Sequence, residues 1–278
     1  MANAPTKPTT PVKKEGSSAS GLFATLTIPI CLAVAILIYI FILGDPSHFA
    51  GGDVKNGLVQ DIFGTVHRGG VLVPLIMSYL LIVIVFSIER FVVIGKATGT
   101  SNIDAFVRRI QAFLNAGNIE AANAECDKQK GSVANVIKSG LKKYREMEAE
   151  HNLDVDQKTL AIQKDIEEAT ALEMPMLEQN LTVIATLVSI GTLSGLLGTV
   201  VGMIKAFSEL ANSGAPNTTA LSAAISEALV NTALGISTSA LSIIMYNVFT
   251  SKIDKLTYAI DETGFSIVQT FAASHKGK

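Results

Sequence analysis

Residues 191–204 read GTLSGLLGTVVGMI, and residues 225–247 read ISEALVNTALGISTSALSIIMYN. They belong to two long apolar segments, Asn180–Ile204 and Leu221–Thr250, which are interrupted throughout by Gly, Ser, Thr and Asn. The only charged side chain in the second segment is Glu227. Polar and ionisable groups at membrane depth are costly, and they usually face a protein interior or an ion path. The two segments therefore predict membrane helices that do more than anchor the chain.

Length and composition favour a membrane protein. The chain has 278 residues, of which 49% are hydrophobic and 17% charged, whereas a soluble domain is typically about 25% charged. The net charge of −2 and the lack of a large basic patch predict no nucleic-acid partner. Four charge-free windows are each long enough for the roughly 20 apolar residues of a spanning helix. The sequence therefore predicts an all-α, polytopic protein in a lipid bilayer.

Charge asymmetry predicts how the four spans are oriented. Lys7, Lys13 and Lys14 precede the first span, and basic residues are few in the loops after the first and third spans. The positive-inside rule then places both termini in the cytoplasm. The predicted order is a disordered tail at 1–21, spans at 22–44, 71–95, 179–207 and 221–251, outer loops at 45–70 and 208–220, a cytoplasmic helical domain at 96–178 and a C-terminal helix or tail at 252–278.

Segment 96–178 is soluble in character, and its apolar residues recur at helical spacing. The sequence SNID before Ala105 resembles a helix N-cap, and AGNIEAANAE starts a second helix after a Gly-Asn break. A third helix is expected over Val133–Glu150. A fourth is expected to begin at Asp154 and to run into the third span, with a kink at Pro175. Both of the last two spans are thus predicted to be long and to extend into the cytoplasm.

Polar and small residues fall on one face of each of the last two spans. On a helix, residues three and four apart are neighbours, so residues at this spacing form a stripe along one face. The stripe of the last span holds Glu227, Asn231, Gly235, Thr238 and Ser242, and that of the third span holds Thr182, Thr186, Ser189, Thr192, Gly195, Thr199 and Gly202. Thr232 flanks the stripe of the last span.

These stripes have a structural and a functional interpretation. Gly191, Gly195, Gly198 and Gly202 follow the small-xxx-small pattern of closely packed membrane helices, and packing is the role expected for them. Glu227 differs, because burial disfavours a charged carboxyl. With polar stripes on both neighbouring helices, a proton path is favoured over a carboxyl that merely reaches the outer interface.

Other chemistry finds little support in the sequence. The four histidines are scattered without metal-ligand spacing, and neither a phosphate-binding loop nor a nucleophile motif occurs. Cys31 and Cys126 lie in segments of different character, which argues against a disulfide. We therefore expect no enzyme activity, no cofactor and no bound metal.

Three short motifs, in order, resemble those of a known family. They are LLGTVVGMIKAF at Leu196–Phe207, AISEALVNTALGI at Ala224–Ile236 and IIMYNVF at Ile243–Phe249, and IERFVVI after the second span also fits. Over roughly Gly70 to Ser251 the chain resembles the MotA/TolQ/ExbB proton-channel family, and its ExbB branch most.

The resemblance implies a function and a set of partners. Such proteins form a ring, usually a pentamer, in the bacterial inner membrane, around the single-span helices of an ExbD-like partner. Proton flow drives motion of that partner, and a TonB-like protein passes the work to outer-membrane transporters. The residues that line the proton route in the family fall on Thr199, Glu227 and Thr232; Asn231, Thr238 and Thr192 are further pore-lining candidates, and Gly235 joins the four glycines of the third span in helix packing.

This chain departs from the family pattern at two prolines and at its N-terminus. Where the family often has Ala-Pro, this chain has Gly191-Thr192, and where it often has Ala-Ile-Pro-Ala, the chain has Ser239–Ser242, with Leu241 in place of the proline. The first span is additional to the three-span members.

Three alternatives to the ExbB role stay open at the sequence level. A TolQ-type envelope motor or a MotA-type flagellar stator would share the same motifs. A tetraspan scaffold that conducts nothing would tolerate Glu227→Gln. A membrane enzyme is the least favoured, because no nucleophile or metal constellation is visible.

Overall fold

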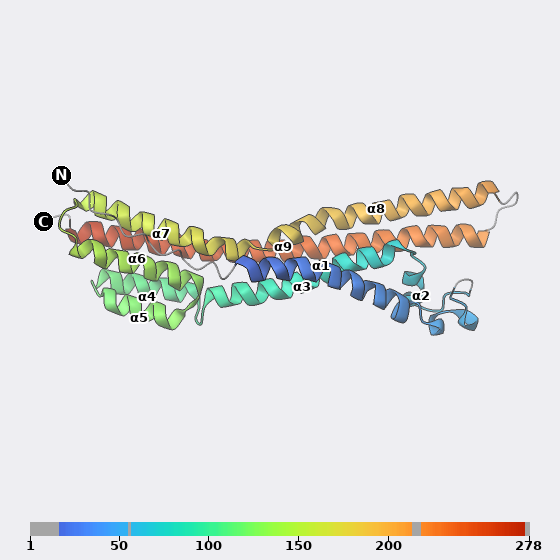
Figure 1. Cartoon of the computed structure of the whole chain (residues 1–278), viewed down its shortest axis with the longest axis horizontal. Coiled ribbons are helices and arrows are strands. Elements are labelled where there is room, and N and C mark those ends of the chain that lie inside the picture. Colours follow the sequence, from blue (N-terminus) through green and yellow to red (C-terminus); the bar gives the residue numbers. More distant parts are fainter. Residues whose placement is uncertain (1–16, 55–56, 213–217, 276–278) are drawn as a thin grey trace, which may run out of the picture.

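The computed structural model describes residues 17–54, 57–212 and 218–275. Within these ranges the chain is helical apart from turns and one isolated bridge between Phe49 and Val59. Figure 1 shows an elongated molecule in which one helix, α9 (Thr218–His275, 58 residues), runs from end to end. The all-helical prediction is confirmed.

One half of the molecule is built from apolar helices. These are α1 (Ser17–Leu37), which continues as the π-helix η1 (Ile38–Leu43), α3 (Leu72–Thr98), α8 (Leu181–Asn212) and the first half of α9. Four helical segments are long and apolar enough to cross a bilayer, and the first of them covers Thr25–Leu43. Their number agrees with the four predicted spans, by length and composition.

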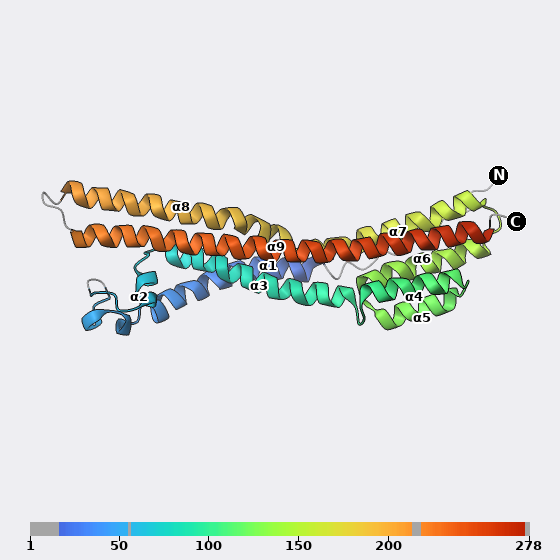
Figure 2. The same cartoon turned by 180° about the vertical axis from the view of Figure 1, so that it is seen from behind.

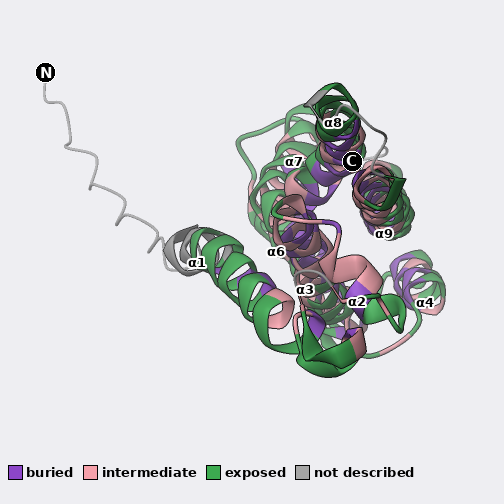
Figure 3. Ribbon diagram, turned by 90° about the vertical axis from the view of Figure 1, so that its right-hand side faces the viewer, coloured by how far each residue is buried: buried purple, intermediate pink, exposed green. Residues whose placement is uncertain are grey.

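The additional first span lies at the edge of the molecule. Figure 3 shows α1 leaning away from α8 and α9, with most of its surface exposed. The contacts of α1 are mainly with α3, and its outward apolar side chains include Leu26, Ile30 and Leu37, each more than half exposed. Such a surface is suited to lipid, because an exposed apolar face is unfavourable in water.

A compact loop segment closes the outer end of α1 and α3. It contains the short helices η2 (Pro46–His48), η3 (Ala50–Gly52) and α2 (Ile62–His67). Asp61 caps α2 by accepting from Gly64 N at 2.9 Å, and Tyr39 Oη donates to His67 O at 3.1 Å. Figure 1 shows that this segment lies at the same end of the molecule as the last turn of α8 and the first turn of α9. Pro216, between these two helices in the chain, lies outside the described residues, and both helices extend into the segment 208–220 expected as a loop.

The other half is a polar bundle, formed by α4 (Ile103–Asn115), α5 (Ile119–Gln129), α6 (Gly131–Ala149), α7 (Val155–Glu178) and the second half of α9. The sequence signals for its helix starts are confirmed. Asn102 and Asn118 cap α4 and α5, and Asp154 forms a capping box with Gln157 at the start of α7. The third helix begins at Gly131, two residues before the predicted start.

The junction of α7 and α8 differs from the prediction. Pro175 lies inside α7, and the helix ends after it, at Glu178. The break falls at Gln179 and Asn180, where Asn180 has a φ of 64°, a left-handed conformation that asparagine tolerates better than most residues. Asn180 rather than Pro175 therefore marks the change of direction between the two helices.

Arg90 of α3 stabilises this break from the side. Its side chain is 1% exposed and donates from Nη1 to Met176 O at 3.0 Å and to Leu177 O at 3.2 Å. The last carbonyls of a helix have no partner within the helix, so Arg90 satisfies two of them. Glu89 balances the charge by accepting from Arg90 Nε at 2.6 Å. The Glu89-Arg90 pair thus joins α3 to the end of α7.

Candidate functional site

The polar residues of the third and fourth spans meet where α8 and α9 run antiparallel. Figures 1 and 2 show the two helices side by side over the outer half of the molecule. Glycines make this approach possible: a Cβ on Gly235 would lie 2.6 Å from Gly191 O and 2.7 Å from Gly195 Cα, and one on Gly202 would lie 2.7 Å from Ala228 Cβ. The structure places all five predicted packing glycines in this α8–α9 contact.

Gly198 gives the sharpest test of this packing. A Cβ there would lie 2.3 Å from Asn231 Cβ, and Asn231 is fully buried. We expect Gly198→Ala to destabilise the protein by about 1–3 kcal/mol, the usual cost of overpacking. The matched control is Gly95→Ala on α3, where a Cβ would meet nothing within 4 Å; this change should stabilise by up to about 1 kcal/mol. Thermal unfolding in detergent measures both, and equal midpoints for the two variants would contradict the packing.

Thr199 and Thr232 lie opposite each other across this contact. Thr232 Oγ1 is 3.5 Å from Thr199 Oγ1, 3.1 Å from Gly195 O and 3.2 Å from Ala228 O. Its single hydroxyl proton can be donated to any one of these three acceptors. Thr199 Oγ1 donates to Leu196 O at 2.7 Å. Both side chains are partly buried. A hydroxyl both donates and accepts, so this pair can orient a water molecule or a carboxyl brought to it.

Glu227 points toward the outer ends of α3 and α8. Its Oε1 lies 2.5 Å from Lys205 Nζ, and its side chain is only 16% exposed. A Cβ on Gly70, whose φ is +77°, would lie 2.5 Å from the same oxygen. The glycine therefore leaves the room that the carboxylate occupies. The site therefore has two parts. Glu227 pairs with Lys205 and lies against Gly70, and Thr199 lies beside Thr232.

The three further pore-lining candidates have different surroundings. Asn231 is fully buried and donates from Nδ2 to Gly69 O at 2.8 Å, so it ties α9 to the turn before α3. Thr238 is fully buried and bonds within its own helix to Leu234 O at 2.9 Å. Thr192 is exposed and lies 2.7 Å from Ser239 Oγ. Asn231 and Thr238 are therefore not accessible from outside the single chain, whereas Thr192 is.

The predicted stripe on α8 divides into two faces. Gly195 and Gly202 are buried against α9, whereas Thr182, Thr186 and Ser189 are exposed. The exposed face changes character along the helix. Its inner half carries these three hydroxyls, and its outer half is an apolar face of α8 formed by Leu196, Thr199, Val200, Met203, Ile204, Phe207 and Ser208. Thr199 is thus one of two polar side chains on an otherwise apolar helix face.

Sequence reasoning missed Lys205, Gly70 and Ser239 as parts of this site. The signal for Lys205 was present, because it is the one basic residue near the outer end of the third span. The contacts of Glu227 with Lys205 and of Thr232 with Thr199 follow the same antiparallel alignment of α9 against α8. The sequence alone does not fix this alignment, but once one contact between the helices is known, the other contact can be predicted.

Within the described part of the chain, no group of three or more His, Cys, Asp or Glu side chains could hold a metal ion. Fold and site together define a multi-pass helical membrane protein with a polar contact between two glycine-packed spans. The family prediction is confirmed by comparison: residues 128–262 match the model of the MotA/TolQ/ExbB proton channel family.

Two curated relatives agree with this assignment. A putative biopolymer transport protein, ExbB-like 3, of Synechocystis sp. is 36% identical over 88 residues, which are 31% of this chain and 42% of that protein. The Tol-Pal system protein TolQ of Pseudomonas aeruginosa is 26% identical over 155 residues, which are 55% of this chain and 67% of that protein. The match to the cyanobacterial relative thus spans less than half of its length.

The structure also bears on the two departures from the family pattern. Both α8 and α9 are continuous helices through Gly191-Thr192 and through Leu241. Neither helix has a proline there to remove a backbone hydrogen bond. This chain therefore has no proline kink at either position.

Proposed function

We propose that this protein is the channel subunit of a proton-driven motor of ExbB type. The observation that carries the proposal is the Thr199–Thr232 hydroxyl pair, 3.5 Å apart, beside the exposed apolar face of α8. An exposed apolar helix face suits contact with a membrane helix of a partner, and the hydroxyl pair is placed to meet a carboxyl on that helix. The partner proposed is an ExbD-like single-span protein, whose proton-driven motion a TonB-like protein passes to outer-membrane transport.

A ring of copies, with five as the number that the resemblance implies, is part of the proposal. It is supported by the apolar side chains that α8 and α9 leave uncovered in the single chain. Contiguous exposed apolar surface of this kind marks contact with protein or lipid. The set more than half exposed on these spans comprises Leu193, Leu196, Leu197, Ile204, Phe207, Leu229, Ile236 and Ile244.

The proposed setting is the bacterial inner membrane, with the polar bundle and both termini in the cytoplasm. The short helices between α1 and α3, the last turn of α8 and the first turn of α9 lie at one end, and the polar bundle lies at the other (Figure 2). This arrangement suits a chain that enters and leaves the bilayer four times. The basic residues where the spans meet the polar bundle support a cytoplasmic location for the bundle, because such residues are enriched on the cytoplasmic side of membrane helices.

A TolQ-type envelope motor is the second candidate. It is supported by the longer match to TolQ, which covers 155 residues against 88 for the ExbB-like relative. The ExbB assignment is supported by the higher identity, 36% against 26%. The motifs do not separate the two roles, because both would use the same proton-carrying contact.

An in-frame deletion of the gene tests the proposal and separates the candidates. An ExbB role predicts loss of uptake of iron-chelate or similar large substrates through the outer membrane, with an intact envelope. Complementation with the wild-type gene should restore uptake. A TolQ role predicts detergent sensitivity and release of periplasmic proteins instead. A deletion strain with normal uptake and a normal envelope would contradict both.

A further inference from the structure

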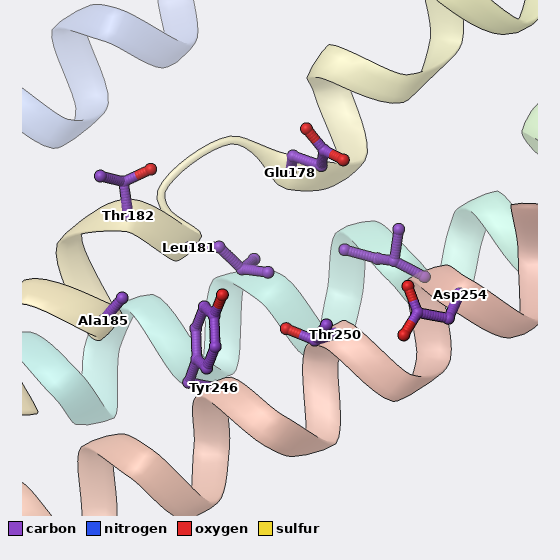
Figure 4. Close-up of a pocket in the computed structure, with 8 residues that line it drawn as sticks. Glu178, Leu181, Thr182, Ala185, Tyr246, Thr250 and Asp254 are labelled. Atoms are coloured by element: carbon purple, nitrogen blue, oxygen red, sulfur yellow. The ribbon is translucent and has the colours of Figure 1, made fainter.

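Glu227 is enclosed, unlike two carboxylates at the inner end of the spans. Glu178 and Asp254, which lie beside the break between α7 and α8 in Figure 4, are exposed. The Glu227 side chain is only 16% exposed. The turn formed by residues 67–70 lies against its carboxyl, and the contacts that hold this turn begin in the additional first span.

The first span changes its helical form at its outer end. Its last six residues, Ile38–Leu43, form the π-helix η1, which Gly44 ends. Turns of π-helix are rare and are frequent at functional sites. The outward side chains of η1, such as Phe41 at 70% exposure, suit lipid, whereas other residues of η1 contact α2 and α3. This end of the first span is therefore packed on the chain that leads to the second span.

Tyr39 of η1 and His67 of α2 make a close, two-way contact. Their rings stack with centroids 4.4 Å apart. Tyr39 Oη donates to His67 O at 3.1 Å, and His67 Nδ1 donates to Tyr39 O at 3.2 Å. Burial lowers the pKa of His67, so its ring is neutral at pH 7 and carries its one proton on Nδ1 for this bond. A Cβ on Gly44 would lie 2.9 Å from His67 Cε1, so the glycine leaves room for the ring.

The His67 carbonyl links this contact to Glu227. His67 O accepts from Gly70 N at 3.2 Å as well as from Tyr39 Oη, so Tyr39 binds the group that closes the turn. Gly70 lies against Glu227, since a Cβ there would be 2.5 Å from Oε1. The Tyr39 phenol and the Glu227 carboxylate also interact electrostatically. A continuous set of contacts therefore joins the first span to the carboxyl on the fourth.

A second contact fixes the turn on α9. Gly69 O accepts from Asn231 Nδ2 at 2.8 Å, and a Cβ on Gly69 would lie 2.8 Å from Val230 Cγ1. The oxygen of Glu227 that lies against the turn, Oε1, is also the one that meets Lys205 Nζ at 2.5 Å. A shift of the turn would therefore change the ion pair.

From these contacts we propose that the additional first span positions Glu227 for its part in proton transfer. Tyr39 holds the turn at residues 67–70 through the His67 carbonyl, and the turn keeps Glu227 Oε1 at Lys205. Tyr39 is therefore a positioning residue, which acts through the turn and not on the proton itself. The inference rests on the proposed function for its effect on flux, but the position of the carboxyl does not.

A zero-length cross-link measures the position of the carboxyl without any transport. A carbodiimide activates Glu227, Lys205 Nζ attacks the activated carboxyl to form an amide, and the carbodiimide leaves as a urea. Glycine methyl ester, added in excess, competes for the same group. We expect Tyr39→Phe to lower the ratio of cross-linked to ester-labelled Glu227 at least threefold, measured on the full chain by peptide mass spectrometry. Tyr258→Phe removes a hydroxyl from a side chain that is 69% exposed, and it should keep the wild-type ratio.

Two glycine variants test the contact of the turn with the carboxyl. Gly70→Ala would place a methyl group 2.5 Å from Glu227 Oε1, so the carboxyl must move. Gly51→Ala is the matched control, because its φ of +73° is close to the +77° of Gly70 but a Cβ there meets nothing within 4 Å. Both changes carry the strain of alanine at positive φ. Only Gly70→Ala should lower the cross-link ratio, by at least fivefold.

Proton flux tests whether this position matters to the route. In proteoliposomes with the single-span partner, Tyr39→Phe should lower flux at least threefold and Gly70→Ala at least fivefold, at equal assembly. Tyr258→Phe and Gly51→Ala should leave flux unchanged.

The cross-link and the flux separate the failure of each claim. Lowered ratios in both variants, without flux in the wild-type complex, would overturn the proposed function and keep the positioning of Glu227. A wild-type ratio in Tyr39→Phe or in Gly70→Ala would overturn the inference. Lowered ratios with full flux in a conducting complex would overturn it as well, because the position of the carboxyl would then not affect the route.

Discussion

Replacing Thr199 by valine should stop proton uptake while leaving the protein folded and assembled. Valine keeps the shape of threonine but can neither donate nor accept a hydrogen bond. Thr199 Oγ1 bonds to Leu196 O of its own helix and receives Thr232 Oγ1 at 3.5 Å. Hydrogen bonds of this kind contribute only about 0.6 kcal/mol to the stability of membrane proteins, so the expected loss of stability is small.

The expected loss of flux is much larger. The hydroxyl is one of two polar groups on an otherwise apolar face of α8, so few other side chains there can replace it in orienting water or a partner carboxyl. A fall of at least about tenfold is expected, which corresponds to about 1.4 kcal/mol in the barrier. Thr232→Val should behave in the same way. The control is Thr170→Val on α7, which removes a similar bond to Ile166 O outside the membrane half. Full flux in both Thr199→Val and Thr232→Val would exclude the hydroxyl pair from the route.

Glu227→Gln should impair proton uptake as strongly. Glutamine preserves the size of the side chain but cannot take up and release a proton. It also leaves Lys205, which is 52% exposed, without its anionic partner. Because Lys205 can turn to water, we expect the fold and the ring to survive the change, with flux reduced at least about tenfold.

Lys205→Met separates two possible roles of that ion pair. If Glu227 served only to pair with Lys205, both variants would impair flux equally. If the carboxyl carries protons, Glu227→Gln should be several-fold worse than Lys205→Met. Glu167→Gln, which removes an exposed carboxylate on α7 that accepts from Gln163, is the matched control. Equal effects of Glu227→Gln and Lys205→Met, measured as flux at equal expression, would contradict a proton-carrying carboxyl.

The parts of the fold that were predictable are those with local signals. Four charge-free runs indicated four spans. The cap signal SNID and the Gly-Asn break before Ile119 indicated where two helices of the polar bundle begin, and the structure shows caps at Asn102, Asn118 and Asp154. A cap is a contact between residues two or three apart, so the sequence contains all of it. The five glycines indicated close packing because their spacing alone defines a flat helix face.

The unpredicted parts depend on contacts between distant segments. Arg90 reaches the end of α7 across 86 residues of sequence, and without that contact Pro175 was the natural place for a break. The α8 stripe looked uniform on a helical wheel, but it divides between α9 and the exposed surface. Glu227 and Thr232 are five residues apart and diverge on the helix, so the structure joins each to a different residue of α8.

Proton flux in proteoliposomes tests the central claim most directly. A potassium diffusion potential drives uptake, and a pH-sensitive dye inside the vesicles reports it, for the chain alone and for the chain with its single-span partner. The account predicts that the chain alone holds a pH gradient, and that the complex dissipates it unless Thr199 is valine. A wild-type complex that is fully assembled and yet carries no more protons than protein-free vesicles would contradict it.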